Sequence, residues 1–157
     1  MKKLLILVLA VVMLCSVSVT AFAADLDEDN KVGTVTVSYG VAEGYVVAIP
    51  TDVIVSTAGV EASLSASSVL IPDGKTLTVS VTSANNFTLA YAGSTIPYTV
   101  SVGEVEQTAA SFTALSLASG TTSGDVTLTF KTTEEDVVNA TKSGSHTDTL
   151  TFTCAVN

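Results

Sequence analysis

The sequence predicts an all-β fold of antiparallel strands, arranged as a sandwich or barrel, with one short helix before the last strand. Apolar and polar residues alternate with a period of two in several runs, which is typical of strands with one buried face. These runs recur at roughly ten-residue intervals, with turn-forming residues between them. The chain has 157 residues, a length that suits one such domain.

In each alternating run, the apolar residues are expected to face the core. GYVVAIPTDVIV is expected to be a further edge strand, which bends at Pro50 and then continues. The expected inward rows are Val35, Val37 and Tyr39; Leu77, Val79 and Val81; Phe87, Leu89 and Tyr91; Tyr98, Val100 and Val102; Val126, Leu128 and Phe130; and Leu150, Phe152, Cys154 and Val156.

Turns are expected between the runs. The sharpest is Pro72-Asp73-Gly74, because proline fixes its φ angle and glycine accepts a positive one. Further turns are expected at residues 41–44, 50–52, 83–86, 93–97 and 119–124.

One segment, TTEEDVVNATKSG, departs from the alternation and predicts a short helix. A threonine is expected to cap its start, followed by acidic residues in the first turn, with Lys142 in the last turn and Gly144 as the stop. This helix would deliver the chain to its last strand.

The N-terminal residues predict export from the cell. Residues 1–23 have a basic start, an apolar run and an A-x-A cleavage site at Ala21 and Ala23, the layout of a secretory signal peptide. The apolar run is shorter than the ~20 residues that a membrane span needs, so no membrane association is expected after cleavage. We expect a flexible acidic arm at 24–31 and a single β-sandwich domain at 32–157.

The charge of the chain bears on its partners. Its formal net charge is −9, and two of its six basic residues lie in the leader, so the mature chain is more acidic still. Nucleic acids and anionic membranes select for clustered Lys and Arg, and the chain has no arginine. We therefore expect neither as a partner.

The C-terminal run holds His146, Asp148 and Cys154, which we interpret as parts of a strand and not as a site. Nucleophilic catalysis would have to be built around His146, the one histidine, and no catalytic motif accompanies it. The sequence therefore predicts no enzyme, no catalytic residue and no cofactor. Asp25, Asp27 and Asp29 are weak candidates for calcium ligands, and the favoured interpretation of the same residues is a solvated acidic arm.

At YVVAIPTDVIV, GKTLTVSVTSANNFTL and SGSHTDTLTF the chain resembles small secreted surface proteins of Gram-positive bacteria, of the WxL-like and fimbrial types. The resemblance covers most of residues 31–157 and implies an immunoglobulin-like sandwich with Greek-key connections. The chain departs from the WxL family in having no tryptophan, so the cell-wall-binding signature of that family is absent.

Three functions are compatible with these observations. The leading expectation is a structural or adhesive protein of the cell surface or extracellular matrix, which associates with itself through edge strands or with other surface proteins. The second is a monomeric binding module that recognises a glycan or host protein through the loops at 83–86 and 119–124. The third is a calcium-stabilised domain.

Overall fold

The structure, a computed structural model, describes residues 35–157. The chain divides into two compact units, Met1–Tyr39 and Gly40–Asn157, and all the described strands lie in the second. This second unit begins later than the expected domain start at residue 32. The expected leader at 1–23 and acidic arm at 24–31 lie outside the described residues. Within residues 35–157, no helix is long and apolar enough to cross a membrane.

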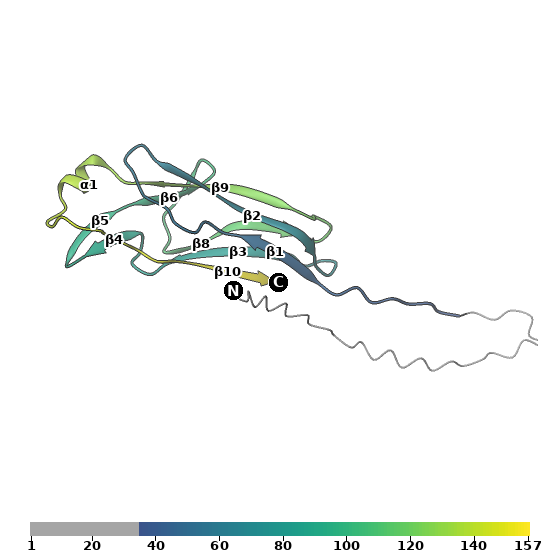
Figure 1. The fold of residues 1–157 in the computed structure, drawn as a ribbon. Coiled ribbons are helices and arrows are strands. Elements are labelled where there is room, and N and C mark those ends of the chain that lie inside the picture. The colour runs from purple at the N-terminus through teal and green to yellow at the C-terminus, as the bar shows by residue number, and fades with distance from the viewer. Residues whose placement is uncertain (1–34) are drawn as a thin grey trace, which may run out of the picture. The chain divides into compact units, whose positions relative to one another are not determined.

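Residues 40–157 form ten β-strands and one short α-helix (Figure 1). In chain order these are β1 (Gly44–Ala48), β2 (Val60–Leu70), β3 (Thr76–Ser83), β4 (Thr88–Tyr91), β5 (Ser94–Pro97), β6 (Thr99–Val102), β7 (Val105–Gln107), β8 (Ser111–Ala118), β9 (Gly124–Lys131), α1 (Glu134–Val138) and β10 (Leu150–Val156).

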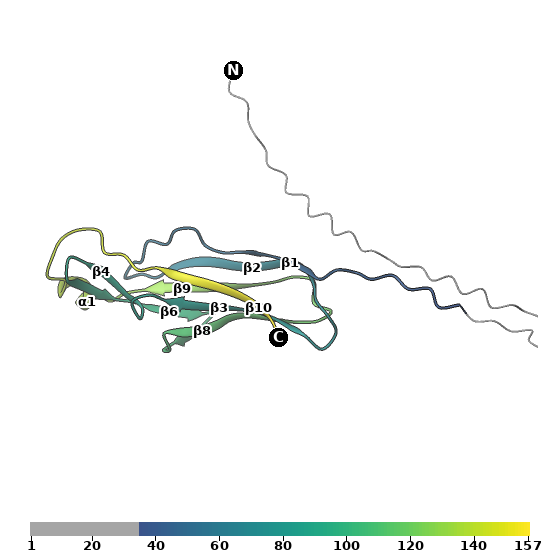
Figure 2. The same ribbon diagram turned by 90° about the horizontal axis from the view of Figure 1, so that it is seen from below.

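The strands form three antiparallel sheets. The largest has the order β1-β2-β9-β6-β7, the second has the order β10-β3-β8, and β4 pairs with β5 alone. Several neighbours are far apart in sequence, since β2 pairs with β9 and β3 pairs with both β8 and β10. Figures 1 and 2 place β4, β5 and α1 together at one end of this unit.

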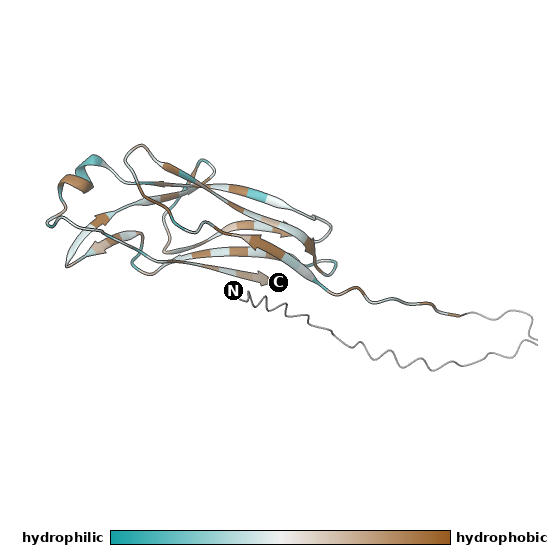
Figure 3. Ribbon diagram, in the orientation of Figure 1, coloured by the Kyte–Doolittle hydropathy of each residue, from teal (hydrophilic) through white to brown (hydrophobic). Residues whose placement is uncertain are grey.

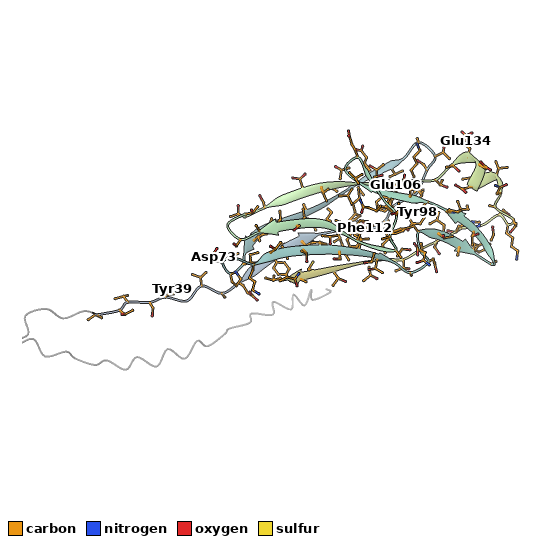
Figure 4. The ribbon with its side chains drawn as sticks, turned by 180° about the vertical axis from the view of Figure 1, so that it is seen from behind. Tyr39, Asp73, Tyr98, Glu106, Phe112 and Glu134 are labelled. Atoms are coloured by element: carbon orange, nitrogen blue, oxygen red, sulfur yellow. The ribbon has the colours of Figure 1, made fainter. Side chains whose placement is uncertain are left out.

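The two larger sheets contribute to one hydrophobic core. Hydrophobic and hydrophilic residues alternate along the strands (Figure 3), and one row of side chains from each of β2, β3, β6, β8, β9 and β10 packs into this core. Tyr98 and Phe112 lie in the interior, while Asp73 and Glu134 mark opposite ends of the unit (Figure 4). The apolar core side chains with almost no exposed surface are Leu64, Leu77, Val79, Val81, Val100, Leu128 and Phe130.

The structure confirms several predicted elements. The inward rows of β3, β6 and β9 are buried or half-buried, as the alternation predicted. The Pro72–Gly74 turn is present, with Gly74 at φ +72° and Lys75 donating its N–H to the Pro72 carbonyl at 3.1 Å. The last strand is also present, and its predicted inward row is half-buried.

Two predictions at the start of the domain are wrong. Val35, Val37 and Tyr39 belong to no strand and are 84, 92 and 91% exposed. Alternation shows which side chains share a face, but not whether the same chain supplies a neighbouring strand. The strand before Pro50 ends at Ala48 and does not continue beyond the proline, which has no N–H to give to a ladder.

The sequence also left strands unpredicted. β2 and β8 are rich in alanine and serine, which favour strands weakly, and their pairing with β9 and β3 outweighs that preference. Residues 94–97 form β5, where a turn was expected. The turn is confined to Ala92 and Gly93, both at positive φ.

The predicted helix is present but ends early. The Thr133 hydroxyl accepts a hydrogen bond from the Asp136 N–H at 3.1 Å and so caps the helix, and three acidic residues fill its first turn. Asn139 caps the C-terminus, so the predicted helical roles of Lys142 and Gly144 are wrong. Lys142 instead donates to the Ala92 carbonyl at 2.7 Å.

Candidate functional site

A polar cluster surrounds the carboxylate of Asp148, just before β10. This carboxylate accepts hydrogen bonds from the Ser83 hydroxyl at 2.6 Å and the Tyr98 hydroxyl at 2.7 Å. It also accepts from the backbone N–H groups of Asn85 at 3.1 Å and Thr149 at 2.7 Å. Asp148 therefore joins the end of β3, the start of β6 and the approach to β10.

Ser83 in turn holds the loop between β3 and β4. Its oxygen accepts hydrogen bonds from the N–H groups of Phe87 at 2.7 Å and Asn85 at 3.2 Å. Asn86 and Phe87 have φ angles of +52° and +55°, which are unfavourable for a residue as bulky as phenylalanine. The Phe87 ring packs edge-on against Tyr98, with ring centroids 5.7 Å apart. Ser83 and Tyr98 thus hold this loop in a conformation that it would not adopt alone.

Burial raises the pKa of Tyr98 well above its usual value, and the hydrogen bond to Asp148 and the charge of that carboxylate raise it further. Only the neutral phenol can donate its proton to Asp148. The cluster therefore keeps Tyr98 as a permanent hydrogen-bond donor at neutral pH.

This shift predicts a loss of stability in alkali. Above pH ~10, the tyrosine of the unfolded chain ionises while folded Tyr98 stays neutral, so the unfolded state is favoured as the pH rises. Tyr98 should then lower the free energy of unfolding by up to ~1.4 kcal/mol per pH unit. Urea unfolding of the natural chain and of Tyr98→Phe from about pH 8 to about pH 11, a range that includes the tyrosine pKa of about 10, measures this loss of stability. Equal slopes for the two proteins would contradict the prediction.

His146 belongs to a second polar group, with Ser94. The His146 Nε2 lies 3.0 Å from the Ser94 hydroxyl, and its Nδ1 lies 3.1 Å from the Gly144 carbonyl. The Ser94 oxygen also accepts hydrogen bonds from the N–H groups of Thr141 at 3.0 Å and Lys142 at 3.3 Å. Ser94 therefore donates its one proton to Nε2, and the imidazole donates its Nδ1 proton to Gly144.

A serine and a histidine in contact resemble part of a nucleophilic site, but this pair is placed differently. Ser94 is only 1% exposed, so a substrate has no direct access to its hydroxyl. The Nδ1 partner is a backbone carbonyl, whereas the usual triads supply a carboxylate there. Asp148 instead binds Ser83 and Tyr98. The hydrogen bonds of Ser94 tie the residues after α1 to β5.

A hollow of about 360 Å³ lies beside the Asp148 cluster. It opens between residues 50–55 and the start of β10, where Leu150 and Phe152 line it. Tyr98, His146 and Asp148 contribute its polar wall. The structure thus brings His146 and Asp148 to one hollow, where the sequence placed them only in one row of a strand.

The other candidate residues lie elsewhere. Cys154 is half-buried within β10 and does not line this hollow. The calcium candidates Asp25, Asp27 and Asp29 lie outside the described residues. Across residues 35–157, no group of three or more His, Cys, Asp or Glu side chains is placed to hold a metal ion.

Comparison with known proteins adds no relative. No protein-family model matches the chain, and neither a curated protein nor a solved structure matches it. The resemblance to Gram-positive surface proteins therefore stays a prediction.

Proposed function

We propose that this chain is a non-catalytic protein that a Gram-positive bacterium exports. It would serve as a structural or adhesive component of the cell surface or extracellular matrix. The observation that carries this proposal is the distribution of exposed apolar side chains. Of thirteen large hydrophobic residues that are exposed in the described chain, eight fall between residues 35 and 54. They are Val35, Val37, Tyr39, Val41, Tyr45, Val46, Ile49 and Ile54.

Such a concentration of exposed apolar residues favours contact with another macromolecule. Single exposed hydrophobic residues are ordinary on a protein surface, but a large exposed set is typical of an interaction site. Between residues 35 and 54 only Glu43 and Asp52 are charged, so few charges lie within this exposed apolar stretch. The signal-peptide layout of residues 1–23 supports an extracellular setting.

The polar clusters support a structural role for the residues that otherwise invite a catalytic interpretation. The Asp148 carboxylate and the Ser83 hydroxyl are engaged with each other and with the loop between β3 and β4. The Ser94 hydroxyl is buried and bonded to His146. Each group holds loops in place, which is the role of a buried and satisfied polar network.

For the fold, we infer an immunoglobulin-like sandwich with Greek-key connections. Its support is the common core of the two larger sheets and the antiparallel pairing of strands that are distant in sequence. A rigid body of this kind suits a protein that bears load or presents a surface.

The proposal predicts self-association of the mature chain. Light scattering of residues 24–157 over a concentration series should show a molar mass that rises with concentration, and negative-stain images should show fibres or regular oligomers. A monomer at every concentration would overturn the structural role. That result would favour the binding module. In the loop at 83–86, Ser83 and Asn85 already make internal hydrogen bonds, and the following residue Phe87 is buried, so the loop at 119–124 would be the first to test for a ligand.

A further inference from the structure

β10 is an edge strand whose one side is unpaired among residues 35–157. It is the outermost strand of the three-stranded sheet, and within the described part of the chain it pairs only with β3, in a ladder that runs without interruption from Leu150 to Val156. Asn157 and Thr76 exchange both backbone hydrogen bonds, so the alternation of an antiparallel ladder directs the backbone groups of every second residue away from β3. These outward groups belong to Leu150, Phe152, Cys154 and Val156, whose side chains also form the half-buried apolar row.

The other edges of the two larger sheets carry devices that discourage further pairing. β1 has an irregular register between Gly44 and Val46, and β8 has one opposite the Val79–Ser80 step. β7 has only three residues and includes Glu106. β10 has seven residues with no bulge, charge, proline or glycine, so it is the edge best suited to accept another strand.

The same chain contains a strand sequence that pairs with nothing in the described structure. Residues 35–41, VTVSYGV, have four apolar residues at alternate positions, and these are 69–92% exposed. Their length matches the seven residues of β10. Four alternating side chains would stand beside the four of the half-buried row.

We propose that residues 35–41 of one copy add as an antiparallel strand to the free edge of β10 in a second copy. This inference rests on the proposed structural function and names its partner as another copy of the chain. The expected pairs are Val35 with Val156, Val37 with Cys154, Tyr39 with Phe152 and Val41 with Leu150. Each pair would exchange backbone hydrogen bonds, and the Tyr39 ring would cover the half-buried Phe152.

The geometry of the chain requires a second copy for this pairing. Gly44 lies opposite Leu70 at the end of β2, and Val156 lies opposite Leu77 near the start of β3. Because only the Pro72–Gly74 turn separates the end of β2 from the start of β3, Gly44 and the end of β10 lie at the same end of the unit. An antiparallel segment would place Val41 beside Leu150, about 20 Å away along β10. The three residues from Val41 to Gly44 span at most about 11 Å, so the segment cannot reach this position within its own chain.

A parallel strand from the same chain is the remaining alternative. All strand pairs in the two larger sheets are antiparallel, which favours the antiparallel arrangement between copies.

Disulfide formation tests the pairing directly. Residues 24–157 contain one cysteine, Cys154, and the variant Val37→Cys adds a second directly opposite it in the proposed pairing. Opposed residues of antiparallel strands have Cα atoms about 5.5 Å apart, within the range that a disulfide spans. Mild oxidation should give a ladder of multimers on a non-reducing gel, and peptide mapping should join residue 37 of one copy to residue 154 of another. Ser38→Cys is the matched control, because its side chain would face away and should give no ladder.

The outcomes separate this inference from the proposed function. A 37–154 disulfide between copies supports the added strand, while one found within single chains overturns it in favour of a parallel strand. Equal cross-linking of Val37→Cys and Ser38→Cys also overturns it. If the natural chain still assembles in light scattering, the proposed function survives that failure, and if it stays monomeric, both proposals fail.

A second pair of variants avoids any change to the folded unit. Val37 is 92% exposed, so Val37→Lys should leave folding intact and abolish the multimers by placing a charge in the covered row. Thr36→Lys places the same charge on the opposite face of the added strand and should retain them. Multimers that persist in Val37→Lys would overturn the proposal.

Discussion

The substitution Phe130→Ala should lower the free energy of unfolding by about 3–5 kcal/mol, because it leaves a cavity in the middle of the core. Phe130 is 1% exposed and lies in β9, which pairs with β2 on one side and β6 on the other. Its side chain stands beside Val100 in the sheet, where it contributes to the core that both larger sheets share. Neighbouring strands held on both sides can relax little into the space.

Urea unfolding followed by circular dichroism measures this loss. The matched control is Phe152→Ala, which removes the same atoms from the half-buried row of β10. Its effect should be clearly smaller at concentrations where the chain is monomeric, because water already reaches part of that ring. An equal loss for both variants would contradict the assignment of β10 as an incompletely covered edge.

The strands that could be predicted from the sequence are those whose residues favour a strand locally. In β3 and β9, β-branched and large apolar residues alternate with threonine and serine, so propensity and pattern agree. In β2 and β8, small residues occupy much of the strand, and only the pairing partners decide its conformation. Such partners are tens of residues away in sequence, where no local pattern indicates them.

The candidate site shows the same limit. His146 and Asp148 stood out as rare residue types, but their partners Ser94, Ser83 and Tyr98 did not. Those partners are 50 to 65 residues away, and serine is too common in this chain for its position to carry a signal. Sequence reasoning could suggest that the two residues were structural, but not which loops they hold.

The segment at 35–41 is an instructive failure of prediction. The alternation of Val35, Val37 and Tyr39 predicted a strand with an inward face, followed by a turn at 41–44, and the structure gives this segment no partner among the described residues. Local propensity for a strand without a partner in the same chain is what strand addition between copies requires. The strand propensity of residues 35–41 therefore explains both why a strand was predicted there and how the segment could add to β10 of another copy.

The substitution Asp148→Ala should cost about 3 kcal/mol or more, since it leaves the hydroxyls of Ser83 and Tyr98 without their acceptor. The hydroxyls of Ser83 and Tyr98 and the Asn85 N–H all donate to this carboxylate. A buried donor left unsatisfied costs roughly 1–3 kcal/mol, and hydrogen bonds to a charged group are stronger than neutral ones. Losing the hydrogen bonds to Asp148 should also release the loop between β3 and β4, because the Ser83 hydroxyl would no longer be oriented to accept a hydrogen bond from the Phe87 N–H.

Two measurements distinguish this effect from a general loss of charge. Asp52→Ala removes an exposed carboxylate that lines the same hollow, and it should change the free energy of unfolding by no more than about 0.5 kcal/mol. Hydrogen exchange should show faster exchange of the Phe87 amide in Asp148→Ala, because its partner Ser83 is no longer fixed. If the two alanine variants unfold at the same urea concentration, the cluster does not hold the loop, and Asp148 would then be available for a role at the hollow itself.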